Sequence, residues 1–133
     1  MNLISVPRFM SADMAVAVHD RQLAEHGGLK DVKDFGLLES AMARPINNHS
    51  YGEEDLCALA AAYAFGIVRN HPFADGNNRT AWVTARVFLH LNGVGLAFDR
   101  ADAIRTVLAL AAGELPEDAV AAWFRKHAVA APV

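Results

Sequence analysis

The spacing of apolar and polar positions along this chain predicts six helices. Apolar side chains recur every three or four residues in each segment, and Ser11 and Asp99 stand where a helix cap is expected. The expected helices cover residues 12 to 25 or 26, about 34–43, 53–69, 78–91, 101–112 and 116–127. The only candidate for strand pairing is a short hairpin within residues 44–52. The fold class is therefore expected to be all-α.

The helix expected over residues 53–69 differs from the others because it is apolar on every side. Small residues surround it: Ala58, Ala60, Ala61, Ala62, Ala64 and Gly66. A helix without a polar face is a buried one, and small side chains let neighbouring helices approach closely. Ser50 and Glu53 form a capping-box pattern that predicts its start. We expect a compact helical bundle around this central helix.

Residues 44–52 are expected to form the one long irregular connection of the chain. They contain Pro45 and Gly52, which interrupt helices, and two consecutive asparagines, which favour turns. A solvated connection is the simplest interpretation of this segment.

Composition narrows the class of protein. With 133 residues, of which 53% are apolar, the chain is expected to form a single domain over residues 1–133. A net charge of −3 with mixed signs argues against direct nucleic-acid binding, which would require a basic face. The single cysteine, Cys57, cannot form an internal disulfide. The first ten residues lack a signal-peptide core, and the longest apolar run, residues 56–68, is too short to span a bilayer. A cytoplasmic protein without membrane attachment is expected.

Residues that can take part in catalysis or ligand binding cluster between the central helix and the next one, in the stretch His71–Ala81. Pro72 disfavours the helical conformation for His71, so the central helix should end just before it, at about Asn70. Gly76 tolerates the left-handed conformation, and a helix should begin at about Asn78. The free N–H groups of that helix start would lie beside a histidine, a carboxylate and an arginine. This combination predicts an anion site with a base and a candidate metal ligand.

The same stretch resembles the signature of the Fic/Doc family, H-P-F-x-[D/E]-G-N-[G/K]-R-x-x-R. Seven positions match in order: His71, Pro72, Phe73, Asp75, Gly76, Asn77 and Arg79. Two positions depart, since Asn78 replaces Gly or Lys and Trp82 replaces the second arginine. The missing arginine, the short chain and the Arg-Thr-Ala continuation are similar to the Doc (death-on-curing) branch. Arg86 lies about 6 Å beyond Trp82 along the helix and is not expected to replace that arginine.

The resemblance implies a toxin that uses ATP and Mg²⁺ to phosphorylate a hydroxyl of a translation factor such as elongation factor Tu. In this interpretation His71 is the catalytic base and Asp75 holds the Mg²⁺. The residues implied in nucleotide and phosphate binding are Gly76, Asn77, Asn78, Arg79 and Arg69. Arg69 has an equally good interpretation as an arginine that complements the dipole at a helix end. The resemblance also implies that residues 44–52 form a flap for the target, with Ile46 and Tyr51 as contacts.

Three alternatives stay open. Transfer of AMP to a protein hydroxyl is the first, because the triphosphate is held without the second arginine. The second is an inactive module that binds nucleotide or phosphate, although His71 and Asp75 are both present. A metal-dependent hydrolase is the third and has too few candidate ligands. Inhibition is expected from a helical antitoxin in trans, since the chain lacks the inhibitory motif [S/T]-x-x-x-E-[G/N], for which residues 50–55 are the nearest match.

Overall fold

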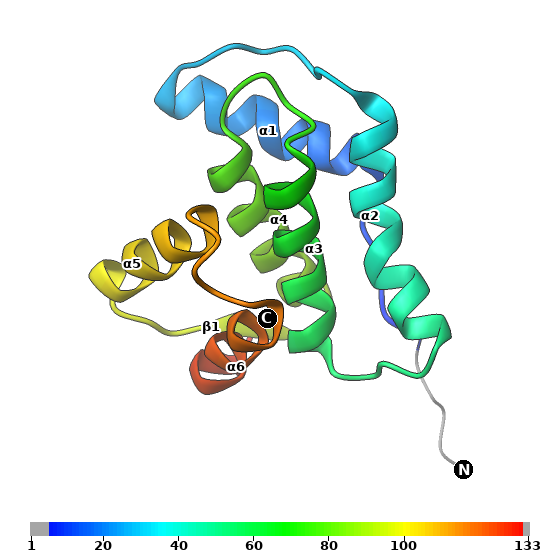
Figure 1. Ribbon diagram of the computed structural model, residues 1–133. Coiled ribbons are helices and arrows are strands. Elements are labelled where there is room, and N and C mark those ends of the chain that lie inside the picture. The colour runs from blue at the N-terminus through cyan, green and yellow to red at the C-terminus, as the bar shows by residue number, and fades with distance from the viewer. Residues whose placement is uncertain (1–5, 132–133) are drawn as a thin grey trace.

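Six helices and a small two-stranded sheet make up the part of the chain that the computed structural model describes, residues 6–131 (Figure 1). In chain order the elements are α1 (Ala12–His26), α2 (Phe35–Ser50), α3 (Leu56–Asn70), α4 (Asn77–Leu91), β1 (Val94–Leu96), α5 (Arg100–Ala111), α6 (Glu117–His127) and β2 (Ala128–Ala130). The expected all-α class is confirmed, and five of the six helices begin and end within three residues of their predicted bounds. The exception is α2, which is longer at its C-terminal end.

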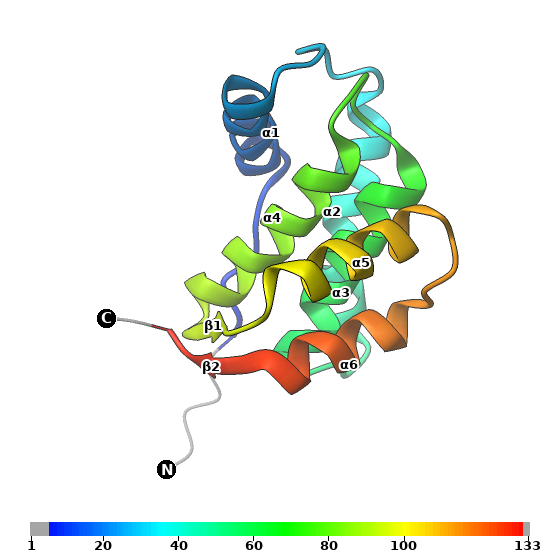
Figure 2. The same ribbon diagram turned by 90° about the vertical axis from the view of Figure 1, so that its left-hand side faces the viewer.

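The predicted central helix is α3, which packs against α2, α4 and α6 (Figures 1 and 2). Ten of its fifteen residues are buried, and they lie on all sides of the helix. Gly66 lets α2 approach, because a Cβ at this position would lie 3.4 Å from the Cα of Ala41. Although α3 carries the longest apolar run, no helix within residues 6–131 combines the length and the hydropathy needed to cross a bilayer.

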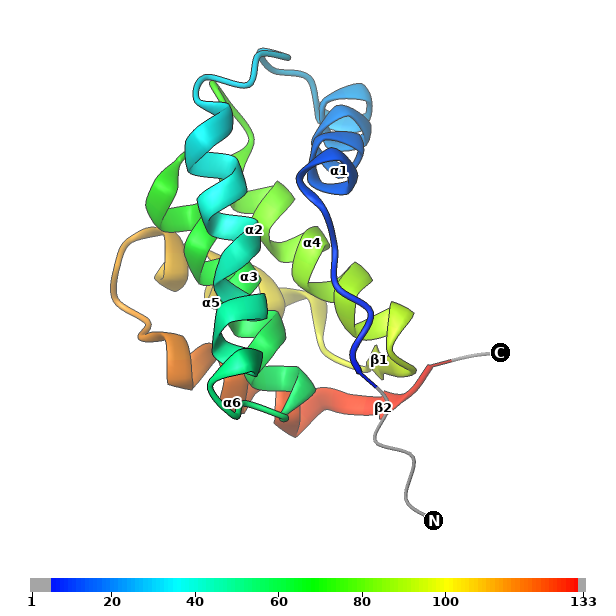
Figure 3. The ribbon, with the colours of Figure 1, turned by 90° about the vertical axis from the view of Figure 1, so that its right-hand side faces the viewer.

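The prediction of an irregular connection over residues 44–52 is wrong, since α2 continues through Pro45 to Ser50 (Figure 3). A proline inside a helix removes a hydrogen bond and costs roughly 3 kcal/mol. Here Pro45 is buried, and Ala41 and Met42 join it in the face of α2 that packs on the core. Burial against α3 offsets the local cost, which is why a signal read from the sequence alone failed.

The start of α3 also differs from its prediction. The helix is capped by Asp55, whose Oδ1 accepts a hydrogen bond from the N–H of Cys57 at 2.9 Å. The expected capping box at Ser50 does not form, because the Ser50 hydroxyl donates to the carbonyl of Ile46 within α2. Glu53 instead accepts a hydrogen bond from the N–H of Asp55. A short turn thus separates two helices that pack side by side.

Two short strands were not predicted. β1 and β2 pair antiparallel, with Val94 opposite Ala130 and Leu96 opposite Ala128 (Figure 2). Each strand has three residues, which is too few for an alternating pattern to appear in the sequence. The pairing ties the chain after α6 to the turn that follows α4.

The segment before α1 is tied to the central helix. The Tyr63 hydroxyl of α3 accepts a hydrogen bond from the N–H of Met10 at 2.8 Å, and burial raises the pKa of Tyr63 to about 12. Ser11 caps α1 as predicted, accepting from the N–H of Met14. α1 then crosses α4 near its N-terminal end (Figure 1), which brings α1 to the loop between α3 and α4.

Candidate functional site

The central helix ends at Asn70 as predicted, and His71 caps it in a left-handed conformation (φ 48°, ψ 54°). No other non-glycine residue between positions 6 and 131 has a positive φ. This conformation is disfavoured for a residue with a Cβ, so the surrounding structure must hold it. One restraint is the hydrogen bond from the N–H of His71 to the carbonyl of Ile67 at 3.1 Å. The result is an imidazole exposed to solvent at the end of a buried helix.

The loop that joins α1 to α2 fixes the 71–76 loop from one side. The carbonyl of Pro72 accepts hydrogen bonds from the N–H groups of Lys33 and Asp34, at 2.8 and 3.1 Å. The N–H of Ala74 donates to the carbonyl of Asp31 at 2.9 Å. Between these bonds, Val32 and Phe73 form an antiparallel bridge. Backbone groups of one loop thus satisfy those of the other, and the 71–76 loop is held in one shape.

Asn77 fixes the same loop from inside. Its Oδ1 accepts from the N–H of Phe73 at 3.0 Å, and its Nδ2 donates to the carbonyl of Phe73 at 2.9 Å. Both residues are buried, with Asn77 only 6% exposed. The side-chain amide expected to meet phosphate is therefore occupied within the protein, and only the backbone N–H of Asn77 remains for a ligand.

A fully buried histidine holds the backbone of Asp75. The Nε2 of His19, on α1, donates to the backbone carbonyl of Asp75 at 2.7 Å. Its ring also stacks on Phe73, with centroids 3.9 Å apart and planes 7° from parallel. The sequence did not indicate this role, because a lone histidine in a helix is usually an ordinary core residue.

Asp75 itself is exposed and faces the space in front of the loop. Its Oδ1 accepts the N–H of Gly76 at 2.8 Å, so this N–H is turned toward the carboxylate rather than toward a ligand. Gly28, at φ +125°, lies against the other carboxylate oxygen, since a Cβ there would come within 2.8 Å of it. A side chain at position 28 would displace the carboxylate, and glycine is required there.

Helix α4 begins immediately after the loop. Gly76 takes the left-handed conformation expected of it (φ 73°, ψ 18°), and the helix starts at Asn77, one residue earlier than predicted. No side chain caps this end, so the N–H groups of Asn77, Asn78 and Arg79 have no intrahelical acceptor. Three free donors and the positive end of the dipole therefore point out of the loop.

These groups line one pocket of about 1030 Å³ between the loop, α4 and α5. Six residues predicted for the site lie in its wall: His71, Asp75, Gly76, Asn77, Asn78 and Arg79. Four cationic side chains line it, Lys33, Arg79, Arg86 and Arg100, against one carboxylate, that of Asp75. None of these cations forms an ion pair within residues 6–131. In a chain of net charge −3, such a wall favours an anionic ligand.

Three other predicted residues lie outside the pocket. Arg69 does not line it, because its guanidinium lies over the ring of Phe65 at 5.4 Å from the centroid. Ile46 is in α2 and Tyr51 caps its C-terminal end, 93% exposed. That end lies at the bottom of Figure 1, whereas the 71–76 loop lies at the top. Residues 44–52 are thus not a flap beside the site, and the loop over residues 27–34 occupies that place.

Trp82, which stands where the family signature has its second arginine, belongs mainly to the core. It is 8% exposed and packs against Trp123 and Phe124 of α6, with ring centroids 5.1 and 5.2 Å away, and its small remaining surface lines the pocket. Arg86, one turn further along α4, lines the pocket with its guanidinium over the ring of Phe98. Lys33 and Arg100 complete the cationic lining and were missed, because only the fold brings their segments to the loop.

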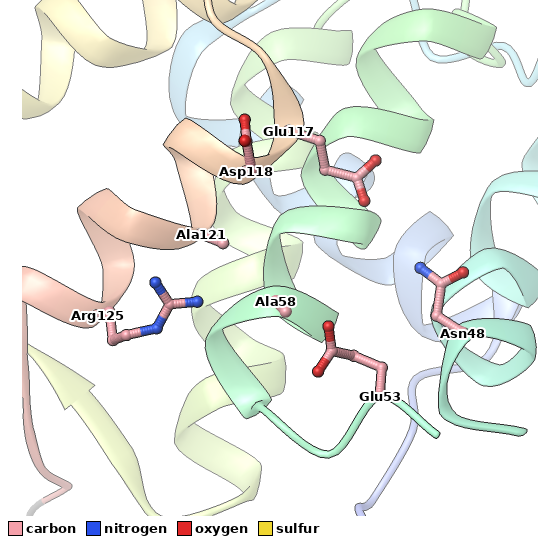
Figure 4. A pocket seen from close by; sticks show the side chains of 7 residues that line it. All are labelled: Asn48, Glu53, Ala58, Glu117, Asp118, Ala121 and Arg125. Atoms are coloured by element: carbon pink, nitrogen blue, oxygen red, sulfur yellow. The ribbon is translucent and has the colours of Figure 1, made fainter. Parts of the chain in front are cut away.

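A second hollow of about 490 Å³ lies between α6, the start of α3 and the end of α2 (Figure 4). Three carboxylates line it, those of Glu53, Glu117 and Asp118, against one cation. That cation, Arg125, is held by Asp55, with 2.9 Å between Nε and Oδ2. The charge of this hollow opposes binding of an anion, so the pocket at the 71–76 loop is the candidate functional site.

Comparison with known proteins agrees with this geometry. Residues 9–89, which include α1, the 71–76 loop and most of α4, match the model of the Fic/DOC family. The chain is 33% identical over 120 residues to "Protein kinase doc" of Escherichia phage P1, covering 90% of this chain and 94% of that protein. It is 49% identical over 76 residues to "Toxin Doc" of Mycolicibacterium smegmatis, covering 55% of this chain and 58% of that protein. The left-handed histidine, the carboxylate and the open helix start thus lie within the matched region, and the chain belongs to the Fic/DOC family.

Proposed function

We propose that this protein is a Doc-type toxin that transfers the γ-phosphate of ATP to a hydroxyl of a target protein. Support comes from the two relatives, one named as a toxin and one named as a protein kinase. The proposed target is a translation factor such as elongation factor Tu, and the proposed inhibitor is a helical antitoxin supplied in trans.

The observation that carries the proposal is the placement of His71. Its exposed imidazole lies in the wall of the same pocket as the free N–H groups of Asn78 and Arg79 and the four unpaired cations. A base beside an anion cradle is what transfer from a nucleoside triphosphate requires. A pocket that only bound phosphate would have no need of a base in a strained backbone conformation.

In the proposed reaction, the target hydroxyl gives its proton to the imidazole of His71 as its oxygen bonds to the γ-phosphorus. The bond between this phosphorus and the β–γ bridging oxygen breaks, and ADP leaves with the electron pair. The N–H groups at the start of α4 and the guanidinium of Arg79 stabilise the charge on the phosphate oxygens. The loop residues need no rearrangement, because Asn77 and His19 already hold them.

Asp75 is the residue that would hold Mg²⁺, and the structure fits this ion. Mg²⁺ is commonly bound by one or two carboxylates, with substrate phosphates and waters as its other ligands. The Asp75 carboxylate is exposed in the pocket, and residues 6–131 contain no group of three or more ligating side chains that would make a protein-only site. When bound, the ion would neutralise charge on the phosphates during transfer.

Transfer of AMP to a protein hydroxyl is the second candidate, and Arg86 is the observation that favours it. The core position of Trp82 leaves the usual place of the second arginine without a charge. Arg86 lines the same pocket from one turn away, so it offers the triphosphate a different anchor. Such an anchor would allow the α-phosphate, instead of the γ-phosphate, to meet His71.

One experiment separates these functions. The protein is incubated with a bacterial lysate and with ATP labelled at either the α- or the γ-phosphate, and His71→Ala is the control. Label on protein from the γ position only supports the kinase, and label from the α position supports AMP transfer. Absence of label from both positions, together with ATP binding, would identify an inactive binding module and reject both transferases.

A further inference from the structure

The α5 side of the pocket carries a second pair of cations, Arg86 and Arg100, away from the 71–76 loop. We propose that these two arginines form a second phosphate subsite. This subsite takes a phosphate group of the bound nucleotide other than the one that meets His71. The inference rests on the proposed use of a nucleoside triphosphate, and it names the residues that hold the far end of the phosphate chain.

Spacing along α4 separates the two subsites. Arg79 and Arg86 are seven residues apart, so they lie on the same face of the helix and about 10 Å apart along its axis. Both line the pocket, as does part of Trp82 between them, whose ring packs against α6. A single phosphate at the start of α4 leaves Arg86 without a partner, whereas a chain of linked phosphates extends toward it.

Arg86 is oriented without being neutralised. Its Cζ lies 5.0 Å from the centroid of the Phe98 ring, and it forms no ion pair within residues 6–131. A cation over an aromatic face is held in place while its N–H donors stay free at the edge. Phe98 lines the same pocket, so the guanidinium is positioned for a ligand on that side.

Arg100 lies where the dipole of its own helix is unfavourable to a positive charge. It is the first residue of α5, at the positive end of that dipole. No carboxylate pairs with it in the described part of the chain, whereas Arg105 on the same helix pairs with Asp102. A bound phosphate would offset the repulsion between the helix dipole and the guanidinium, since it would attract both the helix end and the guanidinium. Arg79 likewise lies in the first turn of its helix, as the third residue of α4, so each of the two helix starts in the pocket carries an arginine.

The test uses binding, which does not require transfer. Affinities for ATP, tripolyphosphate, AMP and inorganic phosphate are measured by calorimetry, with Mg²⁺ present, for the wild type and for Arg86→Gln/Arg100→Gln. We expect the double variant to bind ATP and tripolyphosphate at least about tenfold more weakly, the loss of one charged hydrogen bond or more. Affinities for AMP and inorganic phosphate should change less than about threefold, because each has a single phosphate that the start of α4 can hold.

Arg105→Gln is the matched control, since it removes one positive charge from an exposed position of α5 outside the pocket. It should leave all four affinities close to wild type. The two single variants, with thermal unfolding of each, ensure that a result is obtained if the double variant is poorly folded. We expect each single variant to lose part of the preference for ATP over AMP.

An unchanged ratio of ATP to AMP affinity in the folded variants would overturn the subsite. A raised KM for the protein target with unchanged ATP affinity would also overturn it, since the arginines would then contact the target. If the ratio falls but no transfer of label is found, the subsite stands and the proposed enzyme activity fails. If transfer occurs and the ratio does not fall, the activity stands and the subsite fails.

Discussion

The Nε2 of His19 lies 2.7 Å from the backbone carbonyl oxygen of Asp75, across 56 positions of sequence. Because a carbonyl can only accept, this nitrogen carries a proton, and the Nδ1 of the ring is left buried without a partner. The ring also stacks on Phe73 of the same loop. One side chain of α1 thus holds the 71–76 loop at two points, the ring of Phe73 and the backbone of Asp75.

We predict that His19→Phe preserves the stack but loses the support of Asp75. The partly buried carbonyl of Asp75 would lack its donor, which lowers the free energy of unfolding by about 1–3 kcal/mol. The affinity for ATP should fall more with Mg²⁺ than without it, because the displaced carboxylate is the proposed ion ligand. Denaturant unfolding and ATP titrations check both effects. His19→Gln, which keeps a donor, should recover part of each loss, and wild-type Mg²⁺ dependence in His19→Phe would contradict this role.

Asn77 gives a second prediction, because its two hydrogen bonds to Phe73 are buried. Asn77→Leu has nearly the same shape and leaves the N–H and the carbonyl of Phe73 unpaired. We expect a loss of roughly 3 kcal/mol in the free energy of unfolding, measured in urea. The neighbouring Asn78→Ala is the control, since no hydrogen bond of the Asn78 side chain is found within residues 6–131, and it should change stability by less than about 0.5 kcal/mol. Equal stability of both variants would show that Asn77 does not hold the loop.

The sequence predicted the central helix and the 71–76 loop well because their signals are local. The alanines of α3, the end of the helix before Pro72 and the left-handed Gly76 each follow from the conformational limits of a few adjacent residues. The extent of α2 could not be predicted in this way. Pro45 is a strong local signal for a break, but burial of its face against α3 dominates.

The candidate site was predicted only as far as its residues are adjacent in sequence. His19, Lys33 and Arg100 reach the loop from α1, from the connection before α2 and from α5, and no spacing rule joins these segments. Arg69 was implied by the resemblance, since it lies two residues before His71 where the Doc branch has a basic residue, but a helix turns about 100° per residue, and its side chain lies over Phe65 instead. Proximity in sequence was a poor guide to proximity in space for both sets of residues.

The position of Trp82 leads to a third prediction. Trp82→Arg would restore the family signature, but it would place a charge between α4 and α6 and remove the contacts with Trp123 and Phe124. We expect the free energy of unfolding to fall by about 3–5 kcal/mol. Trp82→Phe, which keeps an aromatic ring, should cost clearly less. A Trp82→Arg protein with wild-type stability and increased AMP transfer would show that the side chain at this position faces the nucleotide.

Asp75→Asn tests the metal site with little change of shape. The amide oxygen can still accept the N–H of Gly76, and the new side chain is no larger against Gly28. We expect the Mg²⁺-dependent part of ATP affinity to fall by about tenfold or more, the size found even for groups that only support a metal ligand. Titration of ATP with and without Mg²⁺ measures this. Asp31→Asn, in the neighbouring loop and outside the pocket, should behave like the wild type, and equal Mg²⁺ dependence of the two variants would remove Asp75 from the ion site.

Asn78 stands at the open start of α4, half-buried in the pocket wall, where the resembling branch has lysine in many members. Asn78→Lys adds a positive charge beside the free N–H groups. A charge-assisted hydrogen bond exceeds a neutral one by about 1 kcal/mol, or around fivefold in rate if it acts only in the transition state. We therefore predict faster γ-phosphate transfer, with a smaller gain in ATP affinity, and Asn78→Gly should favour α-phosphate transfer by opening the loop. Mass analysis of the modified target distinguishes a phosphate from a nucleotide adduct. The same product at the wild-type rate from both variants would mean that position 78 only begins the helix and does not select the chemistry.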